Sequence, residues 1–308
     1  MRKVFITLCL LPAFLSAQVF KTVSAEKVAV GENEEARMAG ISGDGRYIFT
    51  TSWSNQGLTR IDLDSKESRV ITMDAGAGIS PAISTDGSVV MHVCNTIDEN
   101  HLMKSSLQLA DIKEGTSQQL LAPSREYFGY ALRGQQAITL VEGTQPLRRS
   151  IRKTMNDEQS ASRPILVNQG LRMTLTVNGV TRNFAPNGDD DDTSYIWASL
   201  SPDGKRVLYY VSKEGTYVCD INGENLQFIA FECMAPQWYD DQTIVGFRSK
   251  DDGQFIKSSA LMAYTLDGER QQLTEPDQLV MYPFCSAKTG KIIGSSLRGE
   301  IIVLNVTK

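Results

Sequence analysis

Residues 199–208 read SLSPDGKRVL, and this stretch decides the fold. A short apolar strand leads into a tight turn that carries Asp203 and Gly204, and a second β-rich strand follows. Asp-Gly suits such a turn because glycine accepts a positive φ and the carboxylate hydrogen-bonds to nearby backbone amides. The same design recurs at residues 40–49 (GISGDGRYIF) and 82–91 (AISTDGSVVM). The chain therefore contains an internal repeat built on β-hairpins.

Three looser copies of this hairpin keep the outline of an apolar segment, a polar turn and a second apolar run. They begin at Ala131, Trp238 and Phe284, which brings the series to six. A second hairpin lies downstream of each copy. It carries Asn-Gly or Asp-Gly at residues 175–179, 219–223 and 264–268, and weaker versions stand at residues 60–64, 109–115 and 301–306. Both turn series thus count six.

Interleaving the two series gives units of four strands that repeat every roughly 40–50 residues, the period of propeller blades. The sequence therefore predicts an all-β protein, a six-bladed β-propeller of four-stranded blades, with residues 18–308 as a single domain. Five or seven blades are the alternatives, depending on how the long third unit is divided. That unit contains an expected insertion at residues 142–168.

The Ser-Pro-Asp-Gly-Lys turn at residues 201–205, with Tyr-Val-Cys-Asp-Ile-Asn-Gly at 217–223, resembles the repeat of TolB-like (WD40-like) β-propellers. The resemblance covers essentially all of the chain after residue 17. It implies an interaction platform of the cell envelope, whose partner is a protein or peptide. We expect no counterpart of the separate N-terminal α/β domain of TolB.

The two ends of the chain carry further signals. Arg2 and Lys3 precede an apolar run from Val4 to Leu15, which is typical of a signal peptide over residues 1–17 and predicts a periplasmic or secreted protein. The run is too short for an ordinary membrane span. The last unit stops after its third strand, so we expect a strand at residues 21–30 to complete that blade and remove an exposed edge.

The net charge limits the classes of partner, and the cysteine content bears on disulfide bonding. The chain has 31 basic and 36 acidic residues and a net charge of −5, which argues against nucleic-acid binding. We expect a monomer without a bound cofactor. Four cysteines follow the signal segment, and export permits disulfides between them, although burial as small apolar residues is the other interpretation; they are Cys94, Cys219, Cys233 and Cys285.

The face opposite the Asp-Gly turns carries the connections of variable length, and variable loops on a rigid scaffold are common binding sites. The expected insertion contributes Arg148, Arg149 and Arg152 to this face, as a contact for an acidic partner or as solvated loop residues. Leu147, Ile151 and Met155 have helical spacing, which predicts a short amphipathic helical turn.

Four consecutive carboxylates follow in the next connection, and we expect them on the same rim as these arginines. They are a candidate Ca²⁺ site, because this cation prefers oxygen ligands. Pairing with the arginines and plain solvation are the alternatives, since a charge run is usually hydrated. The four residues are Asp189, Asp190, Asp191 and Asp192.

Aromatic residues gather where the first strands of the units begin. At the central mouth of a propeller they are candidates for gripping a peptide or stacking on a sugar, and packing between blades is the other interpretation. The set comprises Trp53, Tyr127, Phe128, Tyr130, Tyr195, Trp197 and Tyr282.

Several activities lack their motifs. Only His92 and His101 are present, so the three-histidine centre of oligogalacturonate lyases, which resemble TolB-like propellers, is impossible within one chain. The Gly-x-Ser-x-Gly elbow and the phosphate-binding Gly-rich loop are both absent from the sequence. We therefore expect a non-catalytic binding propeller. The alternative is a carbohydrate-binding or glycan-cleaving propeller that uses the aromatic mouth.

Overall fold

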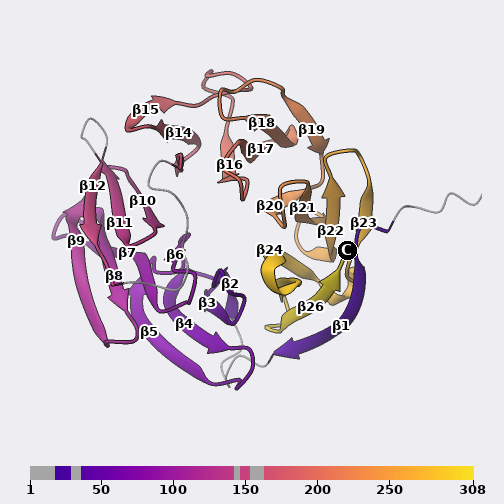
Figure 1. Cartoon of the computed structure of the whole chain (residues 1–308), viewed down its shortest axis with the longest axis horizontal. Helices are drawn as coiled ribbons and strands as arrows, with labels where there is room; N and C mark the ends of the chain where they lie inside the picture. Colours follow the sequence, from indigo (N-terminus) through magenta and orange to yellow (C-terminus); the bar gives the residue numbers. More distant parts are fainter. Residues whose placement is uncertain (1–17, 29–35, 142–145, 153–162) are drawn as a thin grey trace, which may run out of the picture.

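The computed structural model describes residues 18–28, 36–141, 146–152 and 163–308. Its strands form seven antiparallel sheets arranged around a central axis, a β-propeller (Figure 1). The first three sheets, each given from its innermost strand outward, are β2 (Ala36–Ile41), β3 (Tyr47–Ser52), β4 (Gln56–Asp62) and β5 (Ser68–Ala75); β6 (Ala82–Ile83), β7 (Val89–Ile97), β8 (Met103–Asp111) and β9 (Thr116–Ser124); and β10 (Phe128–Arg133), β11 (Gln136–Val141) and β12 (Leu147–Ser150).

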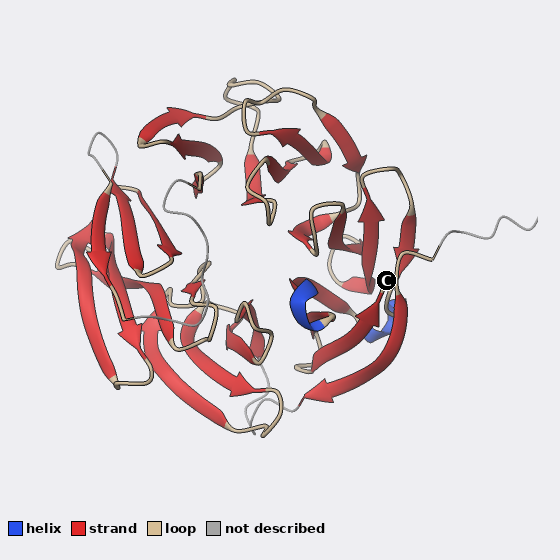
Figure 2. Cartoon of the chain, viewed as in Figure 1, coloured by secondary structure: helices blue, strands red, loops and turns tan. Residues whose placement is uncertain are grey.

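The remaining four sheets complete the ring, and two 3₁₀ turns, η1 (Pro276–Gln278) and η2 (Ala287–Thr289), are the described helical segments (Figure 2). The sheets are β13 (Ile165–Gln169), β14 (Arg172–Val177) and β15 (Val180–Asn183); β16 (Tyr195–Leu200), β17 (Arg206–Val211), β18 (Gly215–Asp220) and β19 (Gln227–Ala230); β20 (Met234–Trp238), β21 (Thr243–Asp251), β22 (Ile256–Thr265) and β23 (Arg270–Gln272); and β24 (Val280–Ser286), β25 (Lys291–Ser296), β26 (Ile301–Thr307) and β1 (Lys21–Val28).

The prediction of six blades is wrong, because the long third unit forms two sheets. Residues 142–168, expected as an insertion, contain β12 and all of β13 except its last residue, Gln169. Each of the two sheets has three strands within the described residues. The third blade has the turn between first and second strands at Gly134 but no described hairpin between third and fourth strands. The fourth blade has the hairpin at Asn178 but begins with β13, so each turn series counted one blade short.

β13 also runs antiparallel to the inner strands of the two neighbouring blades, β10 and β16. Asn168, near its end, hydrogen-bonds to Tyr195 and Ala198 at the start of β16. Arg163, just before its start, donates to the carbonyl of Ser201 just after β16 ends (2.6 Å). β13 thus has the direction of a second strand, yet it occupies the innermost position of its blade. Leu147–Ser150 is strand β12 rather than the predicted helical turn, and Met155 lies outside the described residues.

The ring closes by pairing the two ends of the chain. β1 pairs antiparallel with β26 from Lys21–Thr307 to Val28–Ile301, and the indigo and yellow strands lie side by side in Figure 1. Phe20, just before β1, is fully buried and packs edge-on against Tyr239 of the neighbouring blade, with ring centroids 4.6 Å apart. The expected signal segment, residues 1–17, lies outside the described residues. None of the described helices is long and apolar enough to cross a membrane.

Candidate functional site

A cavity of about 770 Å³ lies on the axis of the ring. The innermost strands of blades one, two and four to seven line it, together with the β3–β4 turn that carries Trp53 and Asn55. This turn and the segment before β6 lie on the face where the inner strands begin, so the cavity extends to the variable-loop face. We call this end of the cavity the mouth. Its size falls in the range of ordinary ligand pockets.

Besides β2, whose register shifts between Met38 and Gly40, three of the inner strands bulge where they line the mouth. The pairing register shifts between Ile196 and Ser199 in β16, and equivalent shifts occur in β20 and β24. Trp197, Ala235 and Tyr282 stand at these bulges with φ values of 54°, 44° and 52°. A left-handed backbone is uncommon for residues other than glycine and is a genuine outlier for bulky ones. Such strain costs of the order of 1–3 kcal/mol per residue and clusters at binding sites.

A polar side chain of the preceding blade holds each bulged strand. The amide of Asn168 accepts from Ala198 N (2.8 Å) and donates to Tyr195 O (3.1 Å), so it spans the bulge of β16. The hydroxyl of Thr216 donates to the carbonyl of Cys233, next to β20 (2.5 Å), and Ser259 donates to Val280 O in β24 (2.8 Å). The bulges are therefore fixed by cross-blade contacts, so the side chains at the mouth are held in place before a ligand binds.

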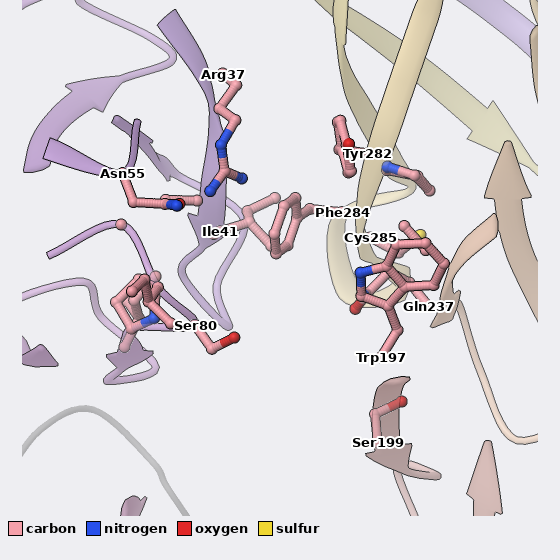
Figure 3. A pocket seen from close by; sticks show the side chains of 18 of the residues that line it. Arg37, Ile41, Asn55, Ser80, Trp197, Ser199, Gln237, Tyr282, Phe284 and Cys285 are labelled. Carbon is pink, nitrogen blue, oxygen red and sulfur yellow. The ribbon is translucent and has the colours of Figure 1, made fainter. Parts of the chain in front are cut away.

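The aromatic rings at the mouth are braced by their neighbours. Trp53 and Tyr282 meet edge to face with centroids 6.1 Å apart, and Tyr282 also contacts Phe247 at 5.2 Å. Trp197 is supported edge-on by Tyr210 at 5.4 Å. Figure 3 shows Trp197 and Tyr282 on one side of the opening, with Asn55 and Ser80 across from them. The mouth is a rigid, partly apolar concavity.

Arg37 of β2 is the single charged residue among the described residues that line the cavity. Its guanidinium points into the opening in Figure 3. Burial lowers the pKa of Arg37, and the neighbouring Tyr282, whose ring lies 5.8 Å from the guanidinium carbon, acts in the opposite direction. The described residues place no carboxylate within ion-pair distance of this side chain. It donates one hydrogen bond, to the carbonyl of Met38 (3.2 Å).

Two further polar atoms at the cavity have no hydrogen-bond partner within the described structure. They are Oδ1 of Asn55 and Oγ of Ser199, both buried. Buried polar groups are usually satisfied, so such atoms indicate groups that a ligand completes. Of the described lining residues, none is Asp, Glu or His. The site offers aromatic surface, one cation and unsatisfied polar atoms, which are groups that can contact a ligand.

The structure brings together three of the aromatic residues named from the sequence: Trp53, Trp197 and Tyr282. Tyr195 is instead fully buried, and its hydroxyl donates to Gly188 O (2.8 Å). Tyr130 is half-buried and its hydroxyl reaches the carbonyls before β6 at 3.0 and 3.1 Å. These two side chains are structural.

Tyr127 and Phe128 also lie away from the cavity. Tyr127 is exposed, outside the cavity lining. Phe128 packs with the buried cluster of blades two and three. The side chains of both residues therefore do not contribute to the mouth.

The arginines of the expected insertion do not form a patch at the mouth. Arg148 and Arg149 are exposed on β12, the outermost described strand of the third blade. Arg152 lies 2.9 Å from a carboxylate oxygen of Asp111 and 3.7 Å from one of Asp86. Asp86 belongs to an Asp-Gly turn, so Arg152 lies on the turn face, opposite the mouth. The expectation that these arginines share a rim with the aspartate run is wrong for Arg152.

The aspartate run is used within the chain. Arg172 pairs with Asp189 (2.7 Å) and Asp191 (3.3 Å). Asp190 accepts hydrogen bonds from the backbone and hydroxyl of Thr193 (2.8 and 2.7 Å), and these bonds lower its pKa. Within the described part of the chain, no group of three or more His, Cys, Asp or Glu side chains is placed to hold a metal ion. The pairing partner is Arg172 rather than an arginine of residues 142–168.

The four described cysteines are free thiols. Cys219 and Cys233 are buried, and burial raises the pKa of both to about 12. At neutral pH these thiols are protonated and unreactive. They act as small core residues.

Comparison with solved structures supports the fold. The β-propeller domain of Cps50 (Swd1) from Myceliophteria thermophila has a TM-score of 0.56 at 11% identity, covering 92% of this chain and 99% of that domain. A chain of a mitotic checkpoint complex has a TM-score of 0.56 at 9% identity over 100% and 99%. TolB from Acinetobacter baumannii has a TM-score of 0.50 at 15% identity, covering 80% of this chain and 55% of that one.

The structure is thus similar to TolB and WD40-type propellers, as the repeat predicts. At identities this low the likeness shows the fold alone. No protein-family model and no curated protein matches this sequence.

Sequence reasoning missed Arg37, Asn55 and Asn168. One signal was available for the bulges. Trp197 and Tyr282 each lie four positions before a turn serine, Ser201 and Ser286, and the left-handed Ser80 lies four before Ser84. Counting back from the repeated turn therefore finds the residues that line the mouth. Nothing in the repeat marks Arg37, because the groups that surround its side chain are set by the assembled ring.

Proposed function

We propose that this protein is a non-catalytic, exported binding propeller that holds a protein or peptide partner at the mouth on its variable-loop face. The observation that carries the proposal is the row of strained bulges that presents Trp197 and Tyr282 to the cavity. Backbone strain persists where the surrounding structure imposes it, and binding sites are where it collects. The proposed export rests on the signal-like segment at residues 1–17.

The hairpins around the mouth add apolar surface. The long β7–β8 hairpin exposes Ile97 and Met103, and the β21–β22 hairpin exposes Phe255. Both hairpins turn on the same face as the β3–β4 turn. Exposed apolar side chains on the face that carries the pocket favour a macromolecular partner, because a partner gains by covering them.

A site-specific crosslinking experiment tests the proposal. A photoreactive amino acid at position 54, an exposed serine in the β3–β4 turn, is compared with one at position 205, an exposed lysine on the turn face. We expect an adduct in an envelope extract from position 54 and none from position 205. Trp197→Ala should weaken that adduct about tenfold, as for a buried aromatic anchor. Adducts from position 205 alone, or an adduct indifferent to Trp197, would contradict the proposal.

A glycan is the second candidate ligand. The aromatic lining favours it, because Trp53, Trp197 and Tyr282 offer apolar ring surface of the kind that contacts sugars. Oligosaccharides added at millimolar concentration would quench tryptophan fluorescence in the wild type but not in Trp197→Ala. If sugars quench and peptides do not, the partner is a glycan.

A further inference from the structure

We propose that Arg37 binds a carboxylate of the peptide partner inside the mouth, an inference that rests on the proposed function. The geometry of this side chain carries the argument. Arg37 is the second residue of the first inner strand, lines the cavity and directs its guanidinium into the opening (Figure 3). Arginine presents several N–H donors in a planar fork that matches a carboxylate.

Several described arginines are paired with a carboxylate, whereas Arg37 lines the cavity without one. Arg46 contacts Asp62 at 2.8 Å, Arg152 contacts Asp111 at 2.9 Å and Arg172 contacts Asp189 at 2.7 Å. Arg37 is half-buried, and within the described residues no carboxylate compensates it. A charge withdrawn from water without a counter-charge is unfavourable, so an anion that enters the mouth gains both an ion pair and hydrogen bonds. The lowered pKa of Arg37 has the same cause, since burial disfavours the charged form.

The neighbours of Arg37 favour a peptide carboxylate over other anions. Oδ1 of Asn55 is a buried acceptor without a donor, and the backbone N–H of a peptide supplies one. A phosphate dianion brings a second charge, and the described lining residues offer no second cation for it. A sugar brings many hydroxyl donors, whereas no carboxylate among the described lining residues accepts them. The rings of Trp53 and Tyr282 suit an apolar side chain next to the carboxylate.

The test uses fluorescein-labelled pentapeptide mixtures, randomised at each position, in three matched forms. One form has a free C-terminal carboxylate, the second has a C-terminal amide without acidic residues, and the third has a C-terminal amide with one internal glutamate. Fluorescence polarisation is measured with the full chain. We expect the free-acid form to bind about tenfold or more tighter than the plain amide, the scale of one buried charge pair. Binding of the third form as tight as the first would assign the carboxylate to a side chain rather than to the C-terminus.

Variants then assign the preference to Arg37. Arg37→Met should abolish the acid-over-amide preference, and Arg37→Lys should keep part of it. Arg125→Met, which removes an exposed arginine from the same face outside the cavity, is the matched control and should keep all of it. Because Arg37 has no carboxylate partner to lose among the residues that the structure describes, Arg37→Met should not lower the melting temperature. A preserved preference in Arg37→Met, or a lower melting temperature with the preference intact, overturns the proposal.

The outcomes separate this inference from the proposed function. Equal binding of acid and amide forms, lost in Trp197→Ala, refutes the carboxylate and leaves peptide binding at the mouth intact. If no peptide form binds, both proposals fail together. Binding of a uronic acid in preference to all peptides would show that Arg37 binds the carboxylate of a glycan and would refute the proposal of a peptide ligand.

Discussion

The two faces of the propeller use polar residues in opposite ways. On the turn face, Ser42, Ser84 and Ser201 each donate to the aspartate two residues later, at 2.6, 2.8 and 2.6 Å. Each serine hydroxyl also accepts a backbone N–H from the strand that follows. On the mouth face, Oδ1 of Asn55 and Oγ of Ser199 have no partner within the described residues, and Trp197 and Tyr282 hold a left-handed backbone.

This difference shows that the turn face stabilises the fold and that the mouth reduces its stability. The repeated turns satisfy their polar atoms within a few residues, so they contribute to folding and can be recognised as a repeat. The mouth is strained and partly unsatisfied, and such features persist only when the rest of the fold compensates for them. Substitutions on the turn face should therefore change stability, and substitutions at the mouth should change binding.

The largest effect should come from opening the ring that supports both faces. Deleting residues 18–28 removes β1 with the buried Phe20 and Val28, and leaves β26 as an exposed edge. We expect a loss of at least about 5 kcal/mol, more than one buried aromatic residue contributes, or failure to fold. Thermal unfolding followed by circular dichroism measures it. Glu26→Ala, an exposed change in the same strand, is the control, and an unchanged melting temperature after the deletion would refute closure by β1.

The next effect distinguishes the two faces directly. Asp86→Ala removes the acceptor of Ser84 and Ser88 in an Asp-Gly turn, where burial alone would raise the aspartate pKa but these hydrogen bonds lower it. We expect a loss of about 1–3 kcal/mol in urea unfolding, the scale of bonds to a charged group, with peptide binding at the mouth unchanged. Asp64→Ala, an exposed change on the same face, should have little effect. If Asp86→Ala binds peptides more weakly than the wild type at an equal fraction of folded protein, the separation of stability on the turn face from binding at the mouth is contradicted.

The next effect is a pH dependence of stability caused by the buried His92 of β7. His92 is buried, and burial lowers its pKa, with Asp74 3.9 Å away acting in the opposite direction. On lowering the pH, the unfolded state therefore takes up a proton near pH 6.5, before the folded state does. The free energy of unfolding is thus highest above pH 6.5 and falls as the pH drops below this value. The slope is at most about 1.4 kcal/mol per pH unit. His92→Gln should flatten the profile measured by urea unfolding, with His101→Gln as control; an unchanged slope in His92→Gln would contradict this.

The smallest effect should come from relieving strain at one bulge. Ala235 has a φ of 44°, which glycine adopts without penalty. Ala235→Gly should raise stability by up to about 1 kcal/mol, because the relieved strain is partly offset by the greater entropy of glycine in the unfolded chain. Ala263→Gly, in the regular strand β22, should instead lower it by about 0.5–1 kcal/mol. Thermal melts of the pair decide the matter, and equal losses in both variants would show that the bulge is unstrained.

Much of the fold could be predicted from the sequence because the turns are local. Asp-Gly and Asn-Gly specify hairpins through the conformations of two residues, so the all-β class and the four-stranded blade could be predicted without long-range information, and β1 (Lys21–Val28) lies within the strand expected at residues 21–30. The blade count could not. Residues 142–168 contain no turn motif that marks the boundary, and β13 is innermost only because the strand occupies the gap between β10 and β16.

The candidate site was predictable in part. Trp53, Trp197 and Tyr282 were found because aromatic residues cluster where first strands begin, but the same pattern also selected Tyr195, whose ring the core buries completely. Period-two alternation does not reveal which side of an inner strand faces the axis once a bulge shifts the register. The bulges of β16, β20 and β24 decide that.

The sequence by itself determined that this chain is a repeat of short β-hairpins whose turns satisfy their own polar groups. Only the tertiary structure decided how many blades close the ring, which aromatic rings reach the axis, and that none of the described carboxylates pairs with Arg37. The physical reason is range. A turn is fixed by residues within five positions of one another, whereas the partners of a side chain on the axis come from blades more than a hundred residues apart, such as Arg37 and Tyr282.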